Sequence, residues 1–168
     1  MVIWLLGISG SGKTTIGSWV VDKLKSDNDL ETFLIDGDLV RSFFDGDLGY
    51  ETKDRRTNIK RIMLAAHVLE QNGIVPVVCN ISPFQDLRNL CRSKFGNYLE
   101  IYLNKSLQTA IKNDVKGLYK NNENLLVGRD LKFDIPESPD LVIDTDNETV
   151  DESRNNTYSF ILKELNSA

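Results

Sequence analysis

A glycine-rich loop close to the N-terminus constrains this chain more than any other feature. Its sequence is Gly7-Ile8-Ser9-Gly10-Ser11-Gly12-Lys13-Thr14, and it lies between a short apolar run, residues 2–6, and a stretch typical of a helix, residues 15–24. A strand, a glycine loop ending in Gly-Lys-Thr and a helix together form a P-loop, in which backbone N–H groups and the helix N-terminus hold phosphate. The alternative, a glycine turn that binds nothing, is disfavoured by this context. The sequence therefore predicts a protein that binds a nucleoside triphosphate.

The side chains at the end of the loop have separate expected roles. Lys13 should reach the β- and γ-phosphates, and Thr14 should offer its hydroxyl to Mg²⁺. The residues expected to bind the nucleoside triphosphate are Gly10, Ser11, Gly12, Lys13, Thr14 and Thr15.

The length and the cysteine content indicate the class of protein. A chain of 168 residues fits one domain with a sizeable core, and no apolar run in it approaches membrane-spanning length. The N-terminal apolar run lacks the flanking features of a signal peptide. Cys79 and Cys91 fit no metal-ligand or redox spacing, so we expect buried thiols in a reducing compartment. These features predict a single cytoplasmic domain, residues 1–168, that does not bind a membrane.

The charged residues are distributed unevenly along the chain. The formal net charge is −5, which argues against a general nucleic-acid binder. Residues 53–61 nevertheless carry five basic side chains and one acidic side chain, whereas residues 130–152 are strongly acidic. An isolated basic patch on an acidic protein suits a small anionic substrate better than a polyanion.

Apolar runs and helix-like segments alternate from one end of the chain to the other. We expect strands at residues 2–6, 32–35, 74–79, 98–103 and 141–143, and helices at residues 13–25, 53–72, 84–93, 106–113 and 150–165. Pro76 is expected to mark the start of the third strand. Such alternation predicts an α/β fold of the P-loop NTPase type, with a parallel five-stranded sheet covered by helices on both faces. Ligands of such sheets bind beyond the carboxyl ends of the strands.

Two carboxylates follow the second expected strand. Asp36 ends that strand and Asp38 comes two positions later, where a side chain can orient Mg²⁺ or accept a proton from an attacking hydroxyl. Asp-Gly is also common in turns, so a plain turn is the alternative. We predict that Asp36 is catalytic and a metal ligand, and that Asp38 assists it.

The long helix expected from residue 53 continues its apolar stripe into polar residues. The stripe passes through apolar residues from Ile59 to Leu69 at spacings of three and four, and its backward extension reaches Arg55 and Asn58. These two side chains either belong to a solvated helix end or point into a polar cleft and hold a ligand. His67 lies off the stripe and is expected at the surface.

Two further segments follow later strands. Ser82 could be the N-cap of the next helix, and Phe84 could stack on a base or simply pack in the core. Residues 114–136 show no clean periodicity, which predicts a lid or binding loop whose basic residues, Lys116, Lys120 and Arg129, could close over phosphate.

Taken together, these segments resemble the adenylylsulfate kinases, P-loop enzymes that phosphorylate the 3′-hydroxyl of adenosine 5′-phosphosulfate. The resemblance spans nearly the whole chain and follows the order of the family's motifs. The Asp-Arg-x-x-Asn-Ile block and the Lys-Gly-Leu-Tyr-Lys block are specific to this family, whereas the P-loop is shared by many families. The matching blocks are residues 7–15, Asp36-Gly37-Asp38-Leu39-Val40-Arg41, Asp54-Arg55-Arg56-Thr57-Asn58-Ile59, Ile81-Ser82-Pro83-Phe84, Lys116-Gly117-Leu118-Tyr119-Lys120 and residues 136–144.

The resemblance implies roles for the matching positions. ATP with Mg²⁺ would be the phosphoryl donor, Asp36 the catalytic carboxylate, and a small nucleotide the acceptor. The resemblance also implies a homodimer. The residues that it places around the acceptor are Asp38, Arg41, Arg55, Asn58, Ile81, Ser82, Phe84, Lys116, Leu118 and Arg129.

The chain departs from the family's pattern around the acceptor base. An aromatic residue that stacks on the acceptor adenine in the family is replaced here by Leu126, and an Arg that helps to hold the ATP adenine is replaced by Asn113. Loss of a stacking ring removes a contact worth about 1–3 kcal/mol. This pattern favours a relative that uses another acceptor, and the cytidine diphosphoramidate kinase of bacterial capsule synthesis fits slightly better than an ordinary adenylylsulfate kinase.

Other classes of function explain the sequence less well. Asn104-Lys105-Ser106-Leu107 resembles a guanine-binding motif, but Leu107 stands where that motif needs a carboxylate. A sugar or shikimate kinase shares the P-loop and leaves the Lys-Gly-Leu-Tyr-Lys block unexplained. A catalytically inactive nucleotide-binding subunit is the alternative from a different class, although Lys13, Thr14 and Asp36 are all present.

Overall fold

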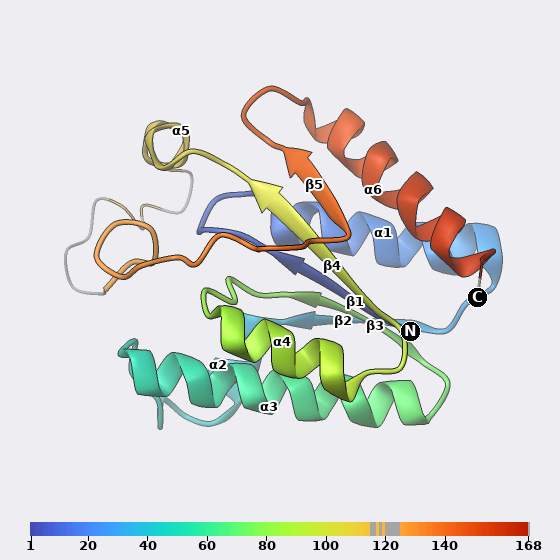
Figure 1. Ribbon diagram of the computed structural model, residues 1–168, viewed down its shortest axis with the longest axis horizontal. Helices are drawn as coiled ribbons and strands as arrows, with labels where there is room; N and C mark the ends of the chain where they lie inside the picture. Colours follow the sequence, from blue (N-terminus) through green and yellow to red (C-terminus); the bar gives the residue numbers. More distant parts are fainter. Residues whose placement is uncertain (115–116, 118, 120–124, 168) are drawn as a thin grey trace.

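The computed structural model describes residues 1–114, 117, 119 and 125–167. Its centre is a five-stranded, all-parallel sheet with the order β2-β3-β1-β4-β5, which confirms the predicted fold (Figure 1). The strands are β1 (Val2–Leu6), β2 (Thr32–Asp36), β3 (Val75–Cys79), β4 (Tyr98–Asn104) and β5 (Leu141–Asp144). The helices are α1 (Lys13–Asn28), α2 (Gly37–Phe43), α3 (Thr52–Gln71), α4 (Gln85–Lys94), α5 (Leu107–Lys112) and α6 (Val150–Leu165).

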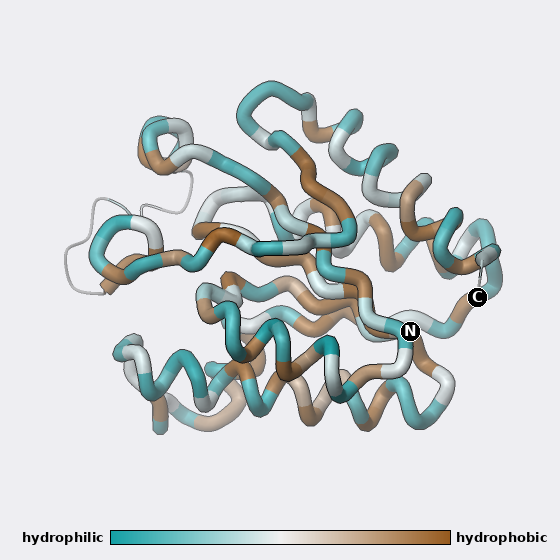
Figure 2. Tube along the Cα trace, viewed as in Figure 1, coloured by the Kyte–Doolittle hydropathy of each residue, from teal (hydrophilic) through white to brown (hydrophobic). Residues whose placement is uncertain are grey.

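The central strand β1 is buried throughout because helices cover both faces of the sheet (Figure 2). Its alternate residues enter two separate cores. Trp4 and Leu6 pack in the core beneath α3 and α4, whereas Ile3 and Leu5 pack in the core beneath α1 and α6. Cys79 and Cys91, one in each core, are free and buried, as the sequence predicted.

Helix α3 buries the predicted stripe together with its polar extension. Ile59, Ile62 and Ala66 are buried, and Arg55 and Asn58 on the same face are only 8% and 3% exposed. His67 is exposed, as predicted.

Helix α2 is the element that the sequence did not predict. Asp36 ends β2 and also caps α2, because its side chain accepts hydrogen bonds from the backbone N–H groups of Asp38 and Leu39. The strand therefore passes directly into a short helix, and not into the plain turn that was the alternative interpretation of Asp-Gly in the sequence.

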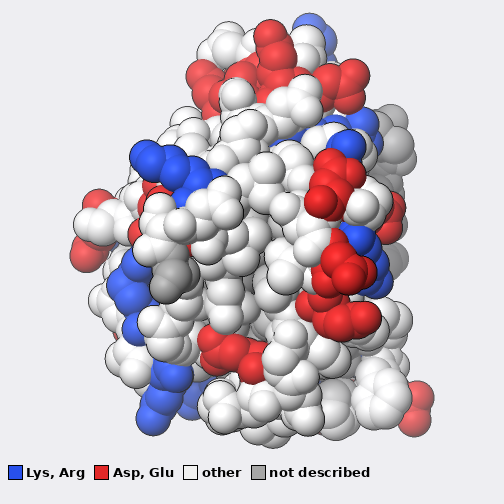
Figure 3. Space-filling model, turned by 90° about the vertical axis from the view of Figure 1, so that its right-hand side faces the viewer, with Lys and Arg blue, Asp and Glu red and all other residues white. Residues whose placement is uncertain are grey.

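All five parallel strands end at the same edge of the sheet, where the P-loop, α2 and the segment after α5 come together (Figure 1). Figure 3 shows the face at the opposite, amino ends of the strands, where acidic side chains lie in several groups among fewer basic ones. That face shows no continuous basic surface among the described residues. Among the described helices, none combines the length and the apolar character needed to cross a membrane.

Candidate active site

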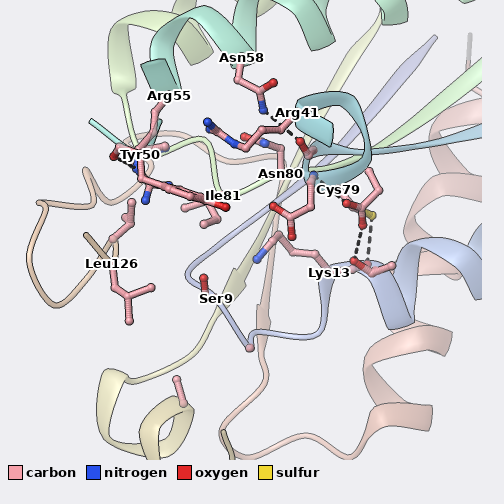
Figure 4. Close-up of a pocket in the computed structure, with 18 of the residues that line it drawn as sticks. Ser9, Lys13, Arg41, Tyr50, Arg55, Asn58, Cys79, Asn80, Ile81 and Leu126 are labelled. Carbon is pink, nitrogen blue, oxygen red and sulfur yellow. Dashed lines mark hydrogen bonds between the residues drawn. The ribbon is translucent and has the colours of Figure 1, made fainter. Parts of the chain in front are cut away.

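A cleft of about 760 Å³ opens at the carboxyl edge of the sheet. It is lined by the P-loop, the junction of β2 with α2, the start of α3, the end of β3 and residues 125–127. Figure 4 shows Arg41, Arg55 and Tyr50 on one side of this cleft and Lys13 and Ser9 on the other. Residues distant in the sequence therefore share one cavity, at the place predicted for a parallel sheet.

The P-loop wraps around the side chain of Lys13. Its Nζ donates hydrogen bonds to the carbonyl oxygens of Gly7 at 2.9 Å and Ile8 at 2.7 Å. Gly12, with a φ of 94°, turns the chain into α1 in a left-handed conformation that favours glycine. The ammonium group and the first N–H groups of α1 lie at the same place, which suits a bound phosphate chain.

Thr14 and Asp36 form the oxygen-rich point of the cleft. Thr14 Oγ1 donates to Asp36 Oδ2 at 2.9 Å, while Asp36 Oδ1 caps α2. A hydroxyl and a carboxylate oxygen are ligands that Mg²⁺ accepts, and this ion usually takes its remaining ligands from water and substrate phosphates. The described residues contain no cluster of three or more His, Cys, Asp or Glu side chains suited to a metal.

Asp38 lies beside Asp36 but in a different setting. Its side chain is exposed and lines the cleft from the first turn of α2. The two carboxylates therefore differ in position: Asp36 lies next to the P-loop threonine, whereas the charge of Asp38 acts on Arg55.

The far wall of the cleft is strongly basic. Arg55 donates to the carbonyl oxygens of Tyr50 at 2.9 Å and Leu125 at 2.5 Å, and Arg41 donates to those of Leu48 at 3.2 Å and Gly49. Burial lowers the pKa of the Arg55 guanidinium, and the positive charge of Arg41 lowers it further. No described carboxylate forms an ion pair with either guanidinium, so this wall offers two positive charges to an anion.

Tyr50, over whose ring both guanidinium groups lie, was not singled out from the sequence. The guanidinium carbon of Arg41 is 4.7 Å from the centre of its ring, and that of Arg55 is 5.4 Å from it. The ring lines the cleft and is partly exposed. Its only signal in the sequence is an aromatic residue within a charged segment just before a helix, which is too common to identify a site.

Asn58 presents a buried polar atom at the cleft. Its Nδ2 donates to the carbonyl oxygen of Gly37 at 3.0 Å, and its Oδ1 has no hydrogen-bond partner among the residues that the structure describes. Such a buried acceptor is costly unless a donor meets it, so a ligand hydroxyl or amine is a fitting partner.

The loop between β3 and α4 contains three predicted site residues, of which one lines the cleft. Ile81 does so, whereas Ser82 and Phe84 do not. The N-cap interpretation of Ser82 was wrong, because Phe84 occupies the N-cap position of α4 and Ser82 is buried with a φ of 48°. The ring of Phe84 lies 5.1 Å from the guanidinium carbon of Arg56.

The segment after α5 closes one end of the cleft. Leu126 lines the cleft and also packs in a small core with Ile8, Ala110 and Tyr119. Tyr119 Oη donates to the carbonyl oxygen of Ser9 at 2.8 Å, so this segment contacts the P-loop directly.

The remaining predicted residues of this segment do not all join the cleft. Arg129 is not part of its lining, because its guanidinium pairs with Asp130 at 2.8 Å and donates to the carbonyl oxygen of Tyr119. Lys116, Leu118 and Lys120 lie outside the described residues.

Cys79 also lines the cleft, but as an inert thiol. Its Sγ donates to the carbonyl oxygen of Lys13 at 3.2 Å, and burial raises the pKa of this thiol to about 12. A protonated, buried thiol is a poor nucleophile, so the cleft is not suited to cysteine chemistry.

A second, smaller hollow of about 140 Å³ lies on the other side of the P-loop. Gly10, Gly12 and Thr15 line both cavities, and Lys105, Thr145 and Glu148 line only the smaller one. Lys105 Nζ donates to the carbonyl oxygen of Thr145 at 3.0 Å, which fixes the wall of this hollow. A bound nucleotide can therefore extend from the P-loop in two directions.

A family model and the curated relatives of this chain indicate the same protein family. The model of the adenylylsulphate kinase family matches residues 1–144. The adenylyl-sulfate kinase of Rippkaea orientalis is 38% identical over 157 residues, which cover 91% of this chain and 86% of that protein.

Solved structures agree with the family match. The APS kinase of Mycobacterium tuberculosis, crystallised in complex with AMPPNP and APS, has a TM-score of 0.87 and 28% identity, covering 95% of this chain and 96% of that chain. The shikimate kinase of Aquifex aeolicus has a TM-score of 0.59 at 16% identity, covering 98% of this chain and 99% of that chain, a likeness of fold alone.

Proposed function

This chain belongs to the adenylylsulfate kinase family, and from that premise we propose that it phosphorylates the ribose 3′-hydroxyl of adenosine 5′-phosphosulfate. As a member of the family it is an ATP-dependent phosphotransferase that acts on a hydroxyl group of a nucleotide. The relatives are named for adenylyl sulfate, which favours this acceptor over the cytidine diphosphoramidate that the sequence alone slightly favoured.

The main support for the proposal is that two regions suited to binding phosphate line the same cleft. The P-loop with Lys13 forms one side, and the guanidinium groups of Arg41 and Arg55 form the other. A kinase needs this arrangement, because the donor and an anionic acceptor must meet with their reacting oxygens close together. Tyr50, over whose ring both guanidinium groups lie, adds aromatic surface beside them at the cleft.

The cleft keeps one aromatic side chain near the acceptor wall although the family's ring is replaced by Leu126. The side chain of Leu126 lines the cleft with aliphatic carbon, and the ring of Tyr50 lines it from the loop before α3. The argument for a cytidine acceptor depended on the loss of stacking at position 126. Tyr50 does not replace that stacking ring, because two guanidinium groups already lie over it; the adenine acceptor is supported instead by the relatives, which are named for adenylyl sulfate.

We assign the donor side to the P-loop. Lys13 would stabilise the charge that develops on the transferred phosphoryl group, and the smaller hollow beside Thr145 would hold the nucleobase of ATP. Thr14 and Asp36 would hold Mg²⁺, which neutralises phosphate charge when bound. Asp38 would face the acceptor from the first turn of α2.

We also propose that residues 1–168 form one kinase domain, with residues 114–136 as its lid, and that the protein acts as a cytoplasmic homodimer. Contact of the lid with the nucleotide site is supported by the hydrogen bond from Tyr119 to Ser9. The proposal of an active enzyme, as opposed to an inactive nucleotide-binding subunit, is supported by the proximity of Thr14 and Asp36 next to Lys13.

The acceptor can be tested directly in a coupled assay that follows ADP release. We expect adenosine 5′-phosphosulfate to give a higher kcat/KM than cytidine diphosphoramidate, with 3′-phosphoadenylyl sulfate as the product. The physical reason is that the two-ring adenine can bury more apolar surface against Leu126 and Val127, which line the cleft, than a pyrimidine can. A higher kcat/KM for the cytidine compound would overturn the proposed acceptor, and turnover of neither would favour the inactive subunit.

Arg55→Ala tests the acceptor wall. We expect the KM for the acceptor to rise about ten- to a hundredfold, because a charge-assisted hydrogen bond to an anionic group contributes about 1.5–3 kcal/mol. The KM for ATP should change little, since Arg55 lies across the cleft from the P-loop. Steady-state kinetics with each substrate varied in turn measures both constants.

The matched control is Arg56→Ala, which removes the neighbouring guanidinium. Arg56 pairs with Asp86 and does not line the cleft, so both KM values should stay near those of the wild type. Equal increases of both KM values in Arg55→Ala would contradict an acceptor-specific role.

A further inference from the structure

Arg88, in α4, is a charged side chain buried in the interior next to the acceptor side of the cleft. It is 1% exposed, and its Nε lies 3.7 Å from Oε1 of the equally buried Glu100. Burial lowers the pKa of Arg88 and raises the pKa of Glu100. The positive charges of Arg88 and Arg92 partly offset the increase in the pKa of Glu100. A buried pair of this kind is weak evidence for a stabilising role, so the hydrogen bonds of Arg88 are the better guide to what it does.

The guanidinium of Arg88 holds two separate segments of backbone together. Its Nη1 donates to the carbonyl oxygen of Ser82 at 2.7 Å, and its Nη2 donates to that of Asp134 at 2.6 Å. The first segment is the loop between β3 and α4, and the second is the return of the chain from the lid. The same segments are joined by the N–H of Asp134, which donates to the carbonyl oxygen of Pro83 at 2.9 Å.

Ser82 transmits this support to residues that line the cleft. Its Oγ accepts a hydrogen bond from Trp4 Nε1 at 2.8 Å and donates to Asn80 Oδ1 at 3.0 Å. Ser82 has a φ of 48°, a left-handed conformation that costs energy for a residue other than glycine. Surrounding contacts must maintain it, and Asn80, Ile81 and Pro83 on either side all line the cleft.

We propose that Arg88 is a positioning residue for the acceptor: by fixing the carbonyl oxygens of Ser82 and Asp134, it sets the wall formed by Asn80, Ile81 and Pro83. This role rests on the proposed function, in which that wall belongs to the acceptor side. It requires arginine, because a planar fork holds two carbonyl oxygens in fixed directions, whereas a lysine ammonium acts as a point charge.

The chain offers a matched control one turn further along α4. Arg92 also approaches Glu100, at 3.8 Å, but its hydrogen bonds go to Asp140 and to the carbonyl oxygen of Ser138. Arg92 does not line the cleft and does not contact Ser82. Loss of either guanidinium disturbs the charge around Glu100, and only loss of Arg88 disturbs the loop.

The experiment compares Arg88→Lys with Arg92→Lys. In Arg88→Lys we expect the acceptor KM to rise about tenfold or more, with the ATP KM within about twofold of the wild type, because a small displacement of a binding wall is costly. The indole N–H resonance of Trp4 should shift, since it reports the hydrogen bond to Ser82, while that of Trp19, on α1, should not. Arg92→Lys should change neither KM and leave both resonances in place.

Three outcomes would overturn the proposal: an unchanged acceptor KM and Trp4 resonance in Arg88→Lys, equal increases of both KM values, or the same changes in Arg92→Lys. If Arg88→Lys does not fold, Trp4→Phe removes the hydrogen bond to the side chain of Ser82, whose backbone carbonyl Arg88 holds, and keeps a ring in the core. We then expect a severalfold rise in the acceptor KM alone, and an unchanged value overturns the proposal.

The resonance measurement separates this proposal from the proposed function. A wild-type protein that phosphorylates none of the tested acceptors would contradict the proposed function. The shift of the Trp4 resonance in Arg88→Lys, with Trp19 unmoved, would still decide whether Arg88 fixes the loop.

Discussion

Replacing Lys13 by alanine is expected to lower kcat by about two to three orders of magnitude while the protein stays folded. The ammonium group lies within the P-loop, 2.7 Å from the carbonyl oxygen of Ile8 and 2.9 Å from that of Gly7. At that place it can stabilise the charge that develops on the transferred phosphoryl group, which is the main task of a phosphoryl-transfer site. Single-turnover kinetics at saturating ATP and acceptor measures the effect on the chemical step.

Lys23→Ala is the control for Lys13→Ala. Lys23 lies on the same helix, α1, in a surface ion pair with Asp27, so its loss should leave kcat unchanged and stability nearly so. Thermal unfolding of both variants would show that the fold is kept. A Lys13→Ala protein that retains more than about a tenth of the wild-type kcat would rule out the assigned role.

Much of the fold could be predicted because the strands of a doubly covered parallel sheet are continuous apolar runs. The expected first strand coincides with β1, and the fourth is one residue shorter than β4 (Tyr98–Asn104). Helix α2 could not be predicted, because Asp-Gly-Asp is typical of a turn and the helix buries only Gly37. Its exposed Leu39 and Phe43 give no amphipathic pattern that points to a core.

The sequence could predict those site residues that continue a regular helical pattern of buried side chains. Arg55 and Asn58 continue the buried stripe of α3, and the structure places both at the cleft. The surroundings of Ser82 depend on Trp4, which is 78 positions away in the sequence, and no local pattern encodes that contact. Arg129 has the right charge for a phosphate contact, but Asp130 beside it forms the ion pair.

Asp36→Asn is expected to lower kcat by about two to four orders of magnitude, with a much smaller effect on ATP affinity. Asparagine is as good an N-cap as aspartate, so α2 should keep its start, and the fold should persist. The change removes the negative charge that faces Thr14 at 2.9 Å, and with it a ligand for Mg²⁺ or an acceptor for the proton of the attacking hydroxyl. Pre-steady-state kinetics together with binding of a fluorescent ATP analogue separates the two effects.

Asp38→Asn is the matched comparison, because it removes a carboxylate from the same turn of the same helix. Asp38 is exposed at the cleft, and within the described part of the chain its side chain accepts no hydrogen bond comparable to the one from Thr14 to Asp36. Its loss should therefore act mainly on the acceptor KM. Charge removed next to Arg41 and Arg55 changes how the wall binds an anion, whereas charge removed next to Thr14 changes the chemical step. An Asp36→Asn enzyme with nearly full activity beside an inactive Asp38→Asn enzyme would exchange the two roles.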